Sequence, residues 1–211
     1  AFVGSTGCRV YQGRKTFLGD GGMGVDLLFN WDKTDLEIYA EGHYQNGEYY
    51  NGWDASGNKD MIPHEAWAGY GGIRLRIKDK GGMHPFIDLS GWYLSGDDGD
   101  IHEKNNDFVS FESVNHAMIL ESDFGLDIDC NYWAIKGEIG TKLPRPLHTL
   151  QLTVFAGYFN LTRTPLIWNN TPFEEHTRIG WEVDVKLPWK VSELVEIFAG
   201  WAMLRDAQFF N

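Results

Sequence analysis

The sequence predicts an all-β fold, an antiparallel sheet whose two faces carry different side chains. Apolar and polar residues alternate with a period of two along most of the chain. The alternating runs last about 10–13 residues, whereas strands in globular proteins usually have roughly 5–6. Tilted strands of about 9–11 residues cross a lipid bilayer. The sequence therefore predicts a transmembrane β-barrel, with residues 1–211 as a single domain.

Four strands are expected between residues 24 and 93, and each gathers its apolar residues on one face. These apolar sets are Val25, Leu27, Phe29 and Trp31; Leu36, Ile38 and Ala40; Trp67, Ile73, Leu75 and Ile77; and Ile87, Leu89 and Tyr93. Polar residues such as Asp26, Glu37 and Asp88 hold the positions between them. Because successive side chains of a strand point to opposite faces, this parity predicts one apolar and one polar face.

Four more strands are expected between residues 133 and 203. Their apolar sets are Trp133, Ile135 and Ile139; Leu150, Leu152, Val154 and Tyr158; Ile179, Trp181, Val183, Val185, Leu187 and Trp189; and Val195, Ile197, Ala199, Trp201 and Met203. A further strand is expected to start near Cys8. The total is about nine strands.

The connections alternate in length. Short turns at residues 32–35, 79–82, 144–146 and 190–192 interleave with long polar segments at 46–63, 96–131 and 163–175. Outer-membrane barrels combine short periplasmic turns with long extracellular loops, and carry aromatic girdles on the lipid face. Trp31, Trp67 and Trp189 lie at strand ends and share the parity of the apolar sets. We therefore expect the protein to lie in the bacterial outer membrane, with the membrane lipid as a partner. A soluble β-sandwich or a lipocalin-like barrel is the alternative.

Composition excludes several other classes. The formal charge of −12 opposes binding to nucleic acid. No stretch reaches the roughly 18–20 apolar residues of a membrane-spanning helix. Ser90, Ser95 and Ser110 stand in no G-x-S-x-G elbow, so the sequence predicts no enzyme, an outer-membrane hydrolase being the less favoured alternative.

Two stretches resemble the alginate-export family of bacterial outer-membrane porins. Gly13-Arg14-Lys15 followed by Leu18-Gly19-Asp20-Gly21 is similar to that family's Gly-Arg-Gln segment and Gly-Asp-Gly turn. Tyr93-Leu94-Ser95-Gly96-Asp97-Asp98 resembles a strand-closing motif of the family. His116-Ala117 and the stretch from Ile179 to Phe210 follow the family's order of elements, whereas Lys15 and Trp181 depart from its pattern.

The resemblance implies a closed barrel of about 18 strands that passes a polysaccharide. Because about nine strands are counted here, we expect a partial chain, a complete barrel of eight to ten strands being the alternative. The expected function is a channel for a polar solute or polysaccharide. A structural barrel or sheath around another component of an outer-membrane complex is the alternative; the sequence identifies no such component.

Charged residues of the polar face are expected to line the lumen and to set its selectivity. They are Arg74, Arg76, Lys136, Glu138, Arg178, Glu182, Asp184 and Lys186. Positive charge along a pore raises the local concentration of anions. Arg74, Arg76 and Arg178 are therefore a candidate anion-selective constriction of the lumen. An interpretation of equal weight is that these charges form ion pairs that satisfy one another.

Two expectations concern the long segment 96–131. Asp97, Asp98 and Asp100 supply the hard oxygen ligands that Ca²⁺ prefers, although a solvated acidic loop is the favoured interpretation. No other cofactor is expected. Cys8 and Cys130 are expected at opposite rims of a bilayer about 30 Å thick, whereas a disulfide needs Cα atoms within roughly 7 Å, so the sequence predicts no bond between them.

Overall fold

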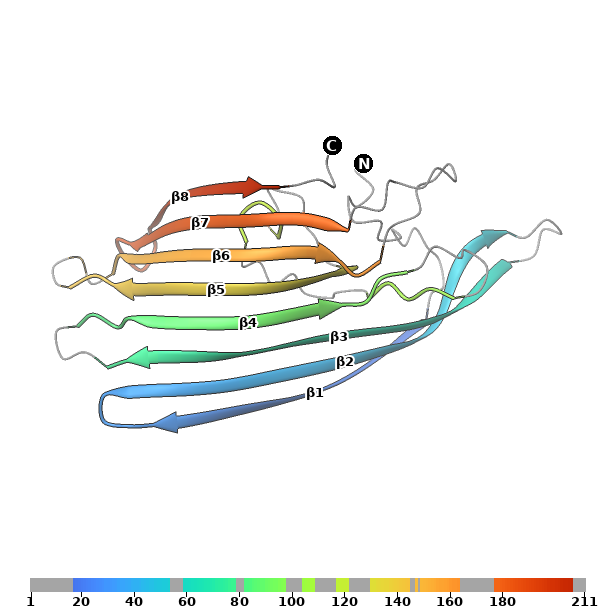
Figure 1. Cartoon of the computed structure of the whole chain (residues 1–211), viewed down its shortest axis with the longest axis horizontal. Coiled ribbons are helices and arrows are strands. Elements are labelled where there is room, and N and C mark those ends of the chain that lie inside the picture. The colour runs from blue at the N-terminus through green and yellow to red at the C-terminus, as the bar shows by residue number, and fades with distance from the viewer. Residues whose placement is uncertain are drawn as a thin grey trace.

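Eight strands form one antiparallel sheet in which every strand pairs with its neighbours in sequence (Figure 1). The structure, a computed structural model, describes residues 17–53, 59–78, 82–97, 104–108, 117–121, 130–144, 147, 149–163 and 177–206. The strands are β1 (Phe17–Asn30), β2 (Thr34–Trp53), β3 (Lys59–Ile77), β4 (Phe86–Leu94), β5 (Tyr132–Lys142), β6 (Gln151–Leu161), β7 (Arg178–Lys190) and β8 (Glu196–Arg205). The all-β, antiparallel prediction is confirmed. Within these residues no helix is long and apolar enough to cross a membrane.

Tight turns join the strands at one end of the sheet. Between β1 and β2 the Trp31 N–H donates to the Thr34 carbonyl oxygen at 2.9 Å. Between β7 and β8 the Ser192 hydroxyl oxygen accepts the N–H groups of Leu194 and Val195 at 3.3 and 3.1 Å. A serine side chain that satisfies the backbone in this way favours a turn. The long connections meet at the opposite end of the sheet (Figure 1).

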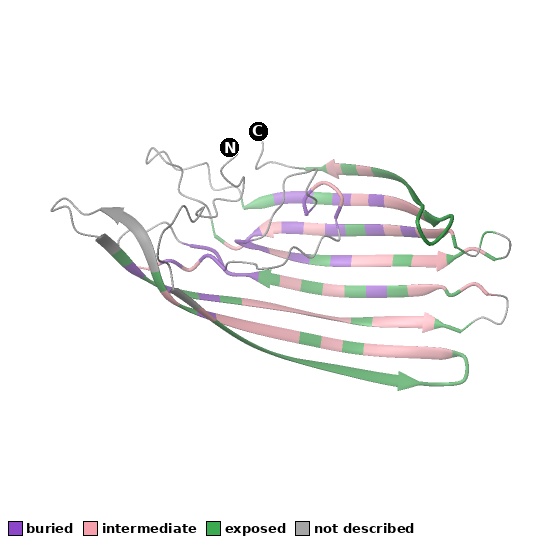
Figure 2. Ribbon diagram, turned by 180° about the vertical axis from the view of Figure 1, so that it is seen from behind, coloured by how far each residue is buried: buried purple, intermediate pink, exposed green. Residues whose placement is uncertain are grey.

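The register places apolar residues beside apolar residues across the sheet. Examples of these pairs are Leu27 with Ile38, Leu36 with Leu75, Ile73 with Leu89, Ile87 with Ile139, Val154 with Val185, and Val185 with Trp201. A shift of one residue would turn each set to the other face. We call the apolar side the outer face and the polar side the inner face. Buried and exposed residues alternate along β4 to β7 accordingly (Figure 2).

The expected long loop at residues 46–63 is wrong, because most of it is a β-hairpin. β2 and β3 have 20 and 19 residues, and their pairing continues to Trp53 and Lys59. The free edge of β3 beyond β4 is occupied by Asn105, whose N–H donates to the Pro63 carbonyl oxygen at 2.8 Å and whose carbonyl oxygen accepts the Glu65 N–H at 3.0 Å. Pairing with a distant segment thus overrides the Gly- and Asn-rich composition that indicated a loop.

The turn that the family resemblance implied at residues 18–21 is also wrong, because these residues lie inside β1. Gly21 pairs with Tyr44 of β2, and Gly22 pairs with His43. A Cβ atom at Gly22 would lie 2.6 Å from the His43 ring, so the glycine leaves room for that side chain. The described residues consequently hold eight strands, and β1 starts at the end of the sheet where the long connections lie. The strand expected to start near Cys8 lies mostly outside the described residues.

Cys130 forms a disulfide, and no described cysteine is free. Cys8 is the only other cysteine of the chain and lies outside the described residues. The prediction that the two cysteines remain unbonded is therefore wrong. Cys130 stands two residues before β5, at the end of the sheet where β1 also starts.

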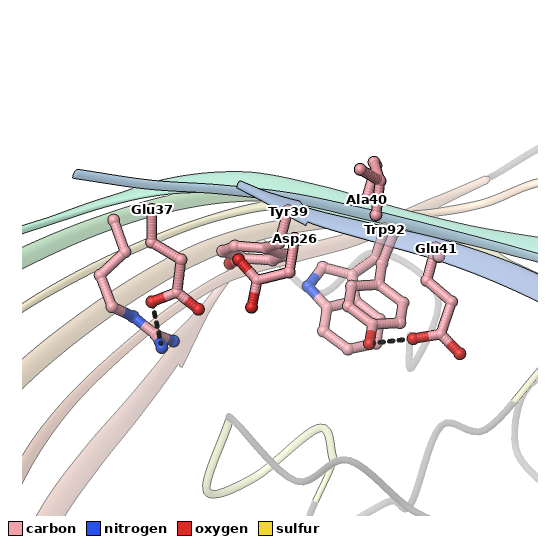
Figure 3. Close-up of a pocket in the computed structure, with 10 residues that line it drawn as sticks. Asp26, Glu37, Tyr39, Ala40, Glu41 and Trp92 are labelled. Atoms are coloured by element: carbon pink, nitrogen blue, oxygen red, sulfur yellow. Dashed lines mark hydrogen bonds and ion pairs between the residues drawn. The ribbon is translucent and has the colours of Figure 1, made fainter. Parts of the chain in front are cut away.

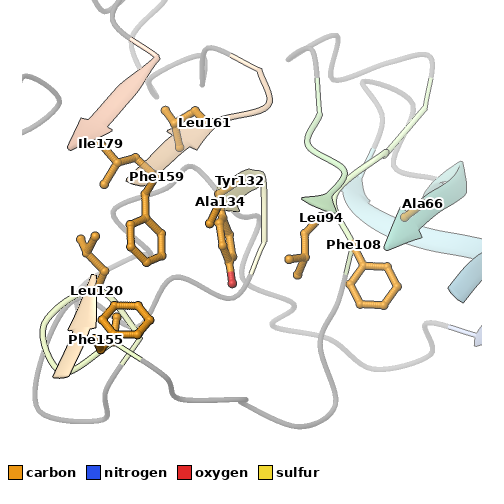
Figure 4. Packing of buried hydrophobic residues seen from close by; sticks show 11 residues of the cluster. Ala66, Leu94, Phe108, Leu120, Tyr132, Ala134, Phe155, Phe159, Leu161 and Ile179 are labelled. Carbon is orange, nitrogen blue, oxygen red and sulfur yellow. The ribbon is translucent and has the colours of Figure 1, made fainter. Parts of the chain in front are cut away.

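A hydrophobic cluster covers the inner face near the long connections (Figure 4). Its largest buried members are Leu94, Phe108, Leu120, Tyr132, Phe155, Phe159, Leu161 and Ile179. Gly157 lies between Phe155 and Phe159, where a Cβ atom would come within 2.5 Å of the Phe159 ring. Two of the members, Phe108 and Leu120, come from the long connection between β4 and β5. This connection therefore folds over the inner face.

Candidate functional site on the inner face

The inner face has two parts with different surroundings. Over β5 to β8 it is covered by residues 117–121, which we call the inserted segment. Over β1 to β4 it is hollowed into a groove (Figure 3). The two parts are described in turn, because the predicted lumen residues divide between them.

Two carboxylates of β7 bind the backbone of the inserted segment. The Asp184 carboxylate accepts the Met118 N–H at 2.8 Å. The two Glu182 oxygens accept the N–H groups of Ile119 and Leu120 at 2.5 and 2.9 Å. A backbone N–H group that is left without an acceptor away from water costs about 1–3 kcal/mol. Glu182 and Asp184 are fully buried, so these three bonds hold the segment against the sheet.

A second anchor is the Glu121 side chain, which contacts β5. Its carboxylate accepts the Tyr132 hydroxyl at 2.7 Å and forms an ion pair with the Lys136 ammonium group. Both Glu121 and Lys136 are buried, and Lys136 Nζ also lies 4.3 Å from the centre of the Trp92 ring. A buried ion pair whose members have further partners is costly to break, because one charge would remain unpaired.

The structure therefore places three predicted lumen residues beneath the inserted segment. Lys136, Glu182 and Asp184 lie on the polar face as expected, but they bind this segment and are closed off from the space beyond it. Glu138 of β5 is half-buried on the same face, and Lys186 Nζ of β7 lies 5.7 Å from the Phe155 ring centre. The segment itself was missed. Its sequence signal was Ala117-Met118-Ile119-Leu120, four apolar residues within an otherwise polar connection.

The candidate constriction of three arginines does not form. Arg178 begins β7 at the end of the long connections, whereas Arg74 and Arg76 lie near the short-turn end of β3. Arg74 lies 2.6 Å from Asp88 and 3.5 Å from Glu37, and Arg76 lies 2.7 Å from Glu37. For Arg74 and Arg76 the interpretation as mutually satisfied ion pairs agrees with these distances.

The groove over β1 to β4 has a volume of about 460 Å³. It is lined by Gly24, Val25, Asp26, Glu37, Tyr39, Ala40, Glu41, Tyr70, Arg74 and Trp92. The side chains of Asp26, Glu37, Tyr39, Glu41 and Trp92 lie on one side of the sheet and that of Ala40 on the other, and the dashed contacts join Glu37 to Arg74 and Glu41 to Tyr70 (Figure 3). The groove is therefore a polar hollow with aromatic side chains among its lining residues.

Three aromatic side chains cross the groove from neighbouring strands. The Tyr70 and Trp92 rings stack at 4.6 Å with 11° between their planes, and the Tyr39 ring lies 6.2 Å from that of Tyr70. The Tyr39 hydroxyl donates to Asp88 at 3.0 Å, and the Tyr70 hydroxyl donates to Glu41 at 2.5 Å. Gly72 makes the Tyr39 position possible, because a Cβ atom there would lie 2.5 Å from the Tyr39 hydroxyl oxygen.

The groove aromatics were not among the predicted site residues. The alternation in the sequence places Tyr39 and Trp92 on the polar face. It does not show which strands are neighbours, and it is the pairing of β2, β3 and β4 that brings both rings to Tyr70. A row of side chains that crosses several strands cannot be recognised in the sequence before the register between those strands is known.

The expected calcium ligands remain a prediction. Asp97 is buried, and its backbone N–H donates to the Asp107 carboxylate at 2.9 Å. Asp98 and Asp100 lie outside the described residues. Among the residues with described positions, no group of three His, Cys, Asp or Glu side chains is placed to hold a metal ion.

Comparison with known proteins adds no assignment. No protein-family model matches this chain, and no curated protein matches its sequence.

Proposed function

We propose that this chain forms part of the wall of a β-barrel channel in the bacterial outer membrane and passes a polar solute. The distribution of side chains over the two faces supports this proposal most strongly. The outer face exposes Ile73, Ile87 and Ile135 by 51%, 55% and 55%. The inner face buries Lys136, Glu182 and Asp184. A water-soluble β protein has the opposite arrangement, with its apolar face inside.

The extent of the apolar surface favours lipid as its surroundings. Exposed large apolar side chains occur on every strand of the sheet except β6, where the outer-face residues Leu152, Val154 and Tyr158 are partly exposed. Soluble monomers rarely expose contiguous apolar patches larger than a few hundred Å². The apolar side chains of such an outer face have to be shielded from water. The hydrocarbon core of a bilayer shields them without a further protein.

Aromatic residues of the outer face gather at the strand ends, as membrane interfaces favour. Level with the end of β4, in the middle of the longer β2 and β3, the Tyr44 and Trp67 rings lie 4.3 Å apart. The Tyr158 and Trp181 rings, near the ends of β6 and β7, lie 4.5 Å apart. Near the short turns Trp31 stacks on Phe29 at 6.2 Å. These rows have the positions of the two aromatic girdles of an outer-membrane barrel.

Strand length and cysteine chemistry agree with this location. β4 to β8 have 9, 11, 11, 13 and 10 residues, close to the length that crosses a bilayer at a tilt. Disulfides such as that of Cys130 persist outside the reducing cytosol. In a bilayer the free edges of β1 and β8 would have to be paired, because unpaired backbone groups are costly in lipid.

The solute path that we propose runs along β1 to β4. The inserted segment covers the inner face of β5 to β8, whereas the groove leaves the inner face of β1 to β4 open. A polysaccharide, as the resemblance to alginate-export porins implies, is one polar solute that such a path would accept.

Reconstitution into planar bilayers tests the channel. The purified full-length protein is expected to give discrete conductance steps, and heat-denatured protein in the same lipid is the control. Proteoliposomes should also swell in an isotonic sugar solution. A protein that inserts into the bilayer yet conducts no ions and admits no sugar would contradict the proposed function and favour a structural barrel.

A further inference from the structure

The groove over β1 to β4 surrounds an aromatic residue with carboxylates. Asp26 of β1 is the direct cross-strand partner of Tyr39. Glu37 and Glu41 stand two residues before and after Tyr39 on β2, and therefore on the same face. All three carboxylates line the groove together with Tyr39 (Figure 3). Neighbouring positions on one face of a sheet lie within about 5–8 Å of each other, so each of the three carboxylates is a neighbour of Tyr39, with Glu37 and Glu41 on either side of it.

The positive charge in the groove does not offset these carboxylates. Arg74 is the only cation among the lining residues, and it already contacts Glu37 and Asp88. Outside the lining, Arg76 also contacts Glu37, and His43 Nε2 lies 2.6 Å from the Glu41 carboxylate. Arg74 lies 5.7 Å from the Tyr39 ring centre, and Lys136 lies 4.3 Å from that of Trp92. Three carboxylates and one guanidinium leave the groove lining with a net negative charge. Asp26 has no ion pair with any described residue and is exposed to the groove.

We propose that this groove is a binding subsite for a cationic organic group, a primary or quaternary ammonium carried by the solute. An ammonium group is attracted here both by the charge of the carboxylates and by the electron-rich faces of the aromatic rings. A polyanion such as a uronate polymer meets like charge instead. This inference rests on the proposed channel, because it names the class of solute that the channel wall would favour.

The groove has the dimensions of a small-molecule site. Its volume of about 460 Å³ falls within the roughly 300–1,000 Å³ of ligand pockets. Its walls are preorganised, because hydrogen bonds fix both tyrosine hydroxyls and ion pairs fix Glu37. A rigid site loses less entropy when a ligand binds.

Calorimetric titration of the detergent-solubilised protein with spermidine tests the subsite. Asp26→Asn removes a carboxylate without disturbing a described contact, and Tyr39→Leu removes the central ring. Each is expected to weaken spermidine binding about three- to fivefold, the worth of one exposed charge or cation–π contact. Glu138→Gln is the matched control, because Glu138 lies on the inner face outside the groove lining.

The outcomes separate this inference from the proposed function. Weaker binding in both groove variants and unchanged binding in Glu138→Gln would support the subsite. Equal loss in all three variants would show diffuse attraction to an acidic protein and overturn it, as would tighter binding of an oligouronate than of spermidine. A protein that conducts ions but does not bind spermidine overturns only the subsite, whereas one that binds spermidine without conducting overturns only the channel.

Discussion

Arg74 lies 2.6 Å from Asp88, and the same Asp88 side chain accepts the hydroxyl of Tyr39 at 3.0 Å. Three strands are thereby joined on the inner face through one carboxylate, which is 8% exposed. Arg74→Gln leaves this carboxylate without its counter-ion, so we expect a loss of about 1–3 kcal/mol in the free energy of unfolding in urea.

A double-mutant cycle isolates this pair. Arg74→Gln combined with Asp88→Asn should cost less than the sum of the two single changes, because the double variant leaves no charge unpaired. Arg76→Gln is the comparison, since Arg76 is more exposed and its loss should cost under about 1 kcal/mol. Additive single changes would show that Arg74 and Asp88 do not stabilise each other.

Loss of the Glu182 carboxylate should release the inserted segment. Glu182→Ala removes the acceptor of the Ile119 and Leu120 N–H groups, and each N–H group left without an acceptor away from water costs about 1–3 kcal/mol. We expect faster hydrogen exchange at residues 118–120 and a larger single-channel conductance. Glu193→Gln, in the exposed turn before β8, should change neither. Protected amides in Glu182→Ala would contradict the proposed anchor.

A methyl group at Gly72 should distort the groove. The added Cβ atom of Gly72→Ala would lie 2.5 Å from the Tyr39 hydroxyl oxygen and 2.6 Å from the Leu89 carbonyl oxygen. Overpacking of this kind costs about 1–3 kcal/mol, which should appear as a lower Tm. Gly137→Ala is the control, because its nearest neighbour would be 3.9 Å away. Equal Tm values for the two variants would show that Tyr39 does not pack across Gly72.

Reduction of the Cys130 disulfide should destabilise the end of the sheet where the long connections lie. We expect no free thiol in the native protein and a loss of about 2–4 kcal/mol in the free energy of unfolding after reduction. Peptide mapping without reductant should recover Cys130 only in a cross-linked peptide. Quantitative alkylation of Cys130 in the native protein would contradict this disulfide.

Strand parity was readable from the sequence, because one apolar face imposes a period of two that survives any choice of neighbours. The sequence alternates from residue 178 to 189, and β7 covers this stretch as Arg178–Lys190. The placement of Ile179 in the apolar set of the outer face is wrong, because the register shifts beside Phe159 and Ile179 is buried in the hydrophobic cluster of the inner face. The features that the sequence did not reveal depend on pairing with residues that are distant along the chain. Residues 46–53 extend β2 because β3 pairs with them, and Gly21 lies in a strand because Tyr44 stands beside it.

For the candidate site too, the sequence revealed the face on which a residue lies but not its distant partners. Lys136 and Glu182 could be assigned to the polar face, but their partners come from residues 117–121 and could not be assigned. A turn that is fixed by side chains more than 60 residues away leaves no local pattern. The groove likewise required the register of four strands before Asp26, Tyr39 and Trp92 formed one surface.

Spin-label accessibility at adjacent positions of one strand tests the central claim, that the outer face contacts lipid. Leu89 is 59% exposed on the outer face of β4, and Ser90 follows it on the inner face. In proteoliposomes a label at Leu89 should be relaxed by oxygen and shielded from a water-soluble nickel complex, whereas a label at Ser90 should show the reverse. Equal relaxation of both labels by the nickel complex would contradict the membrane barrel.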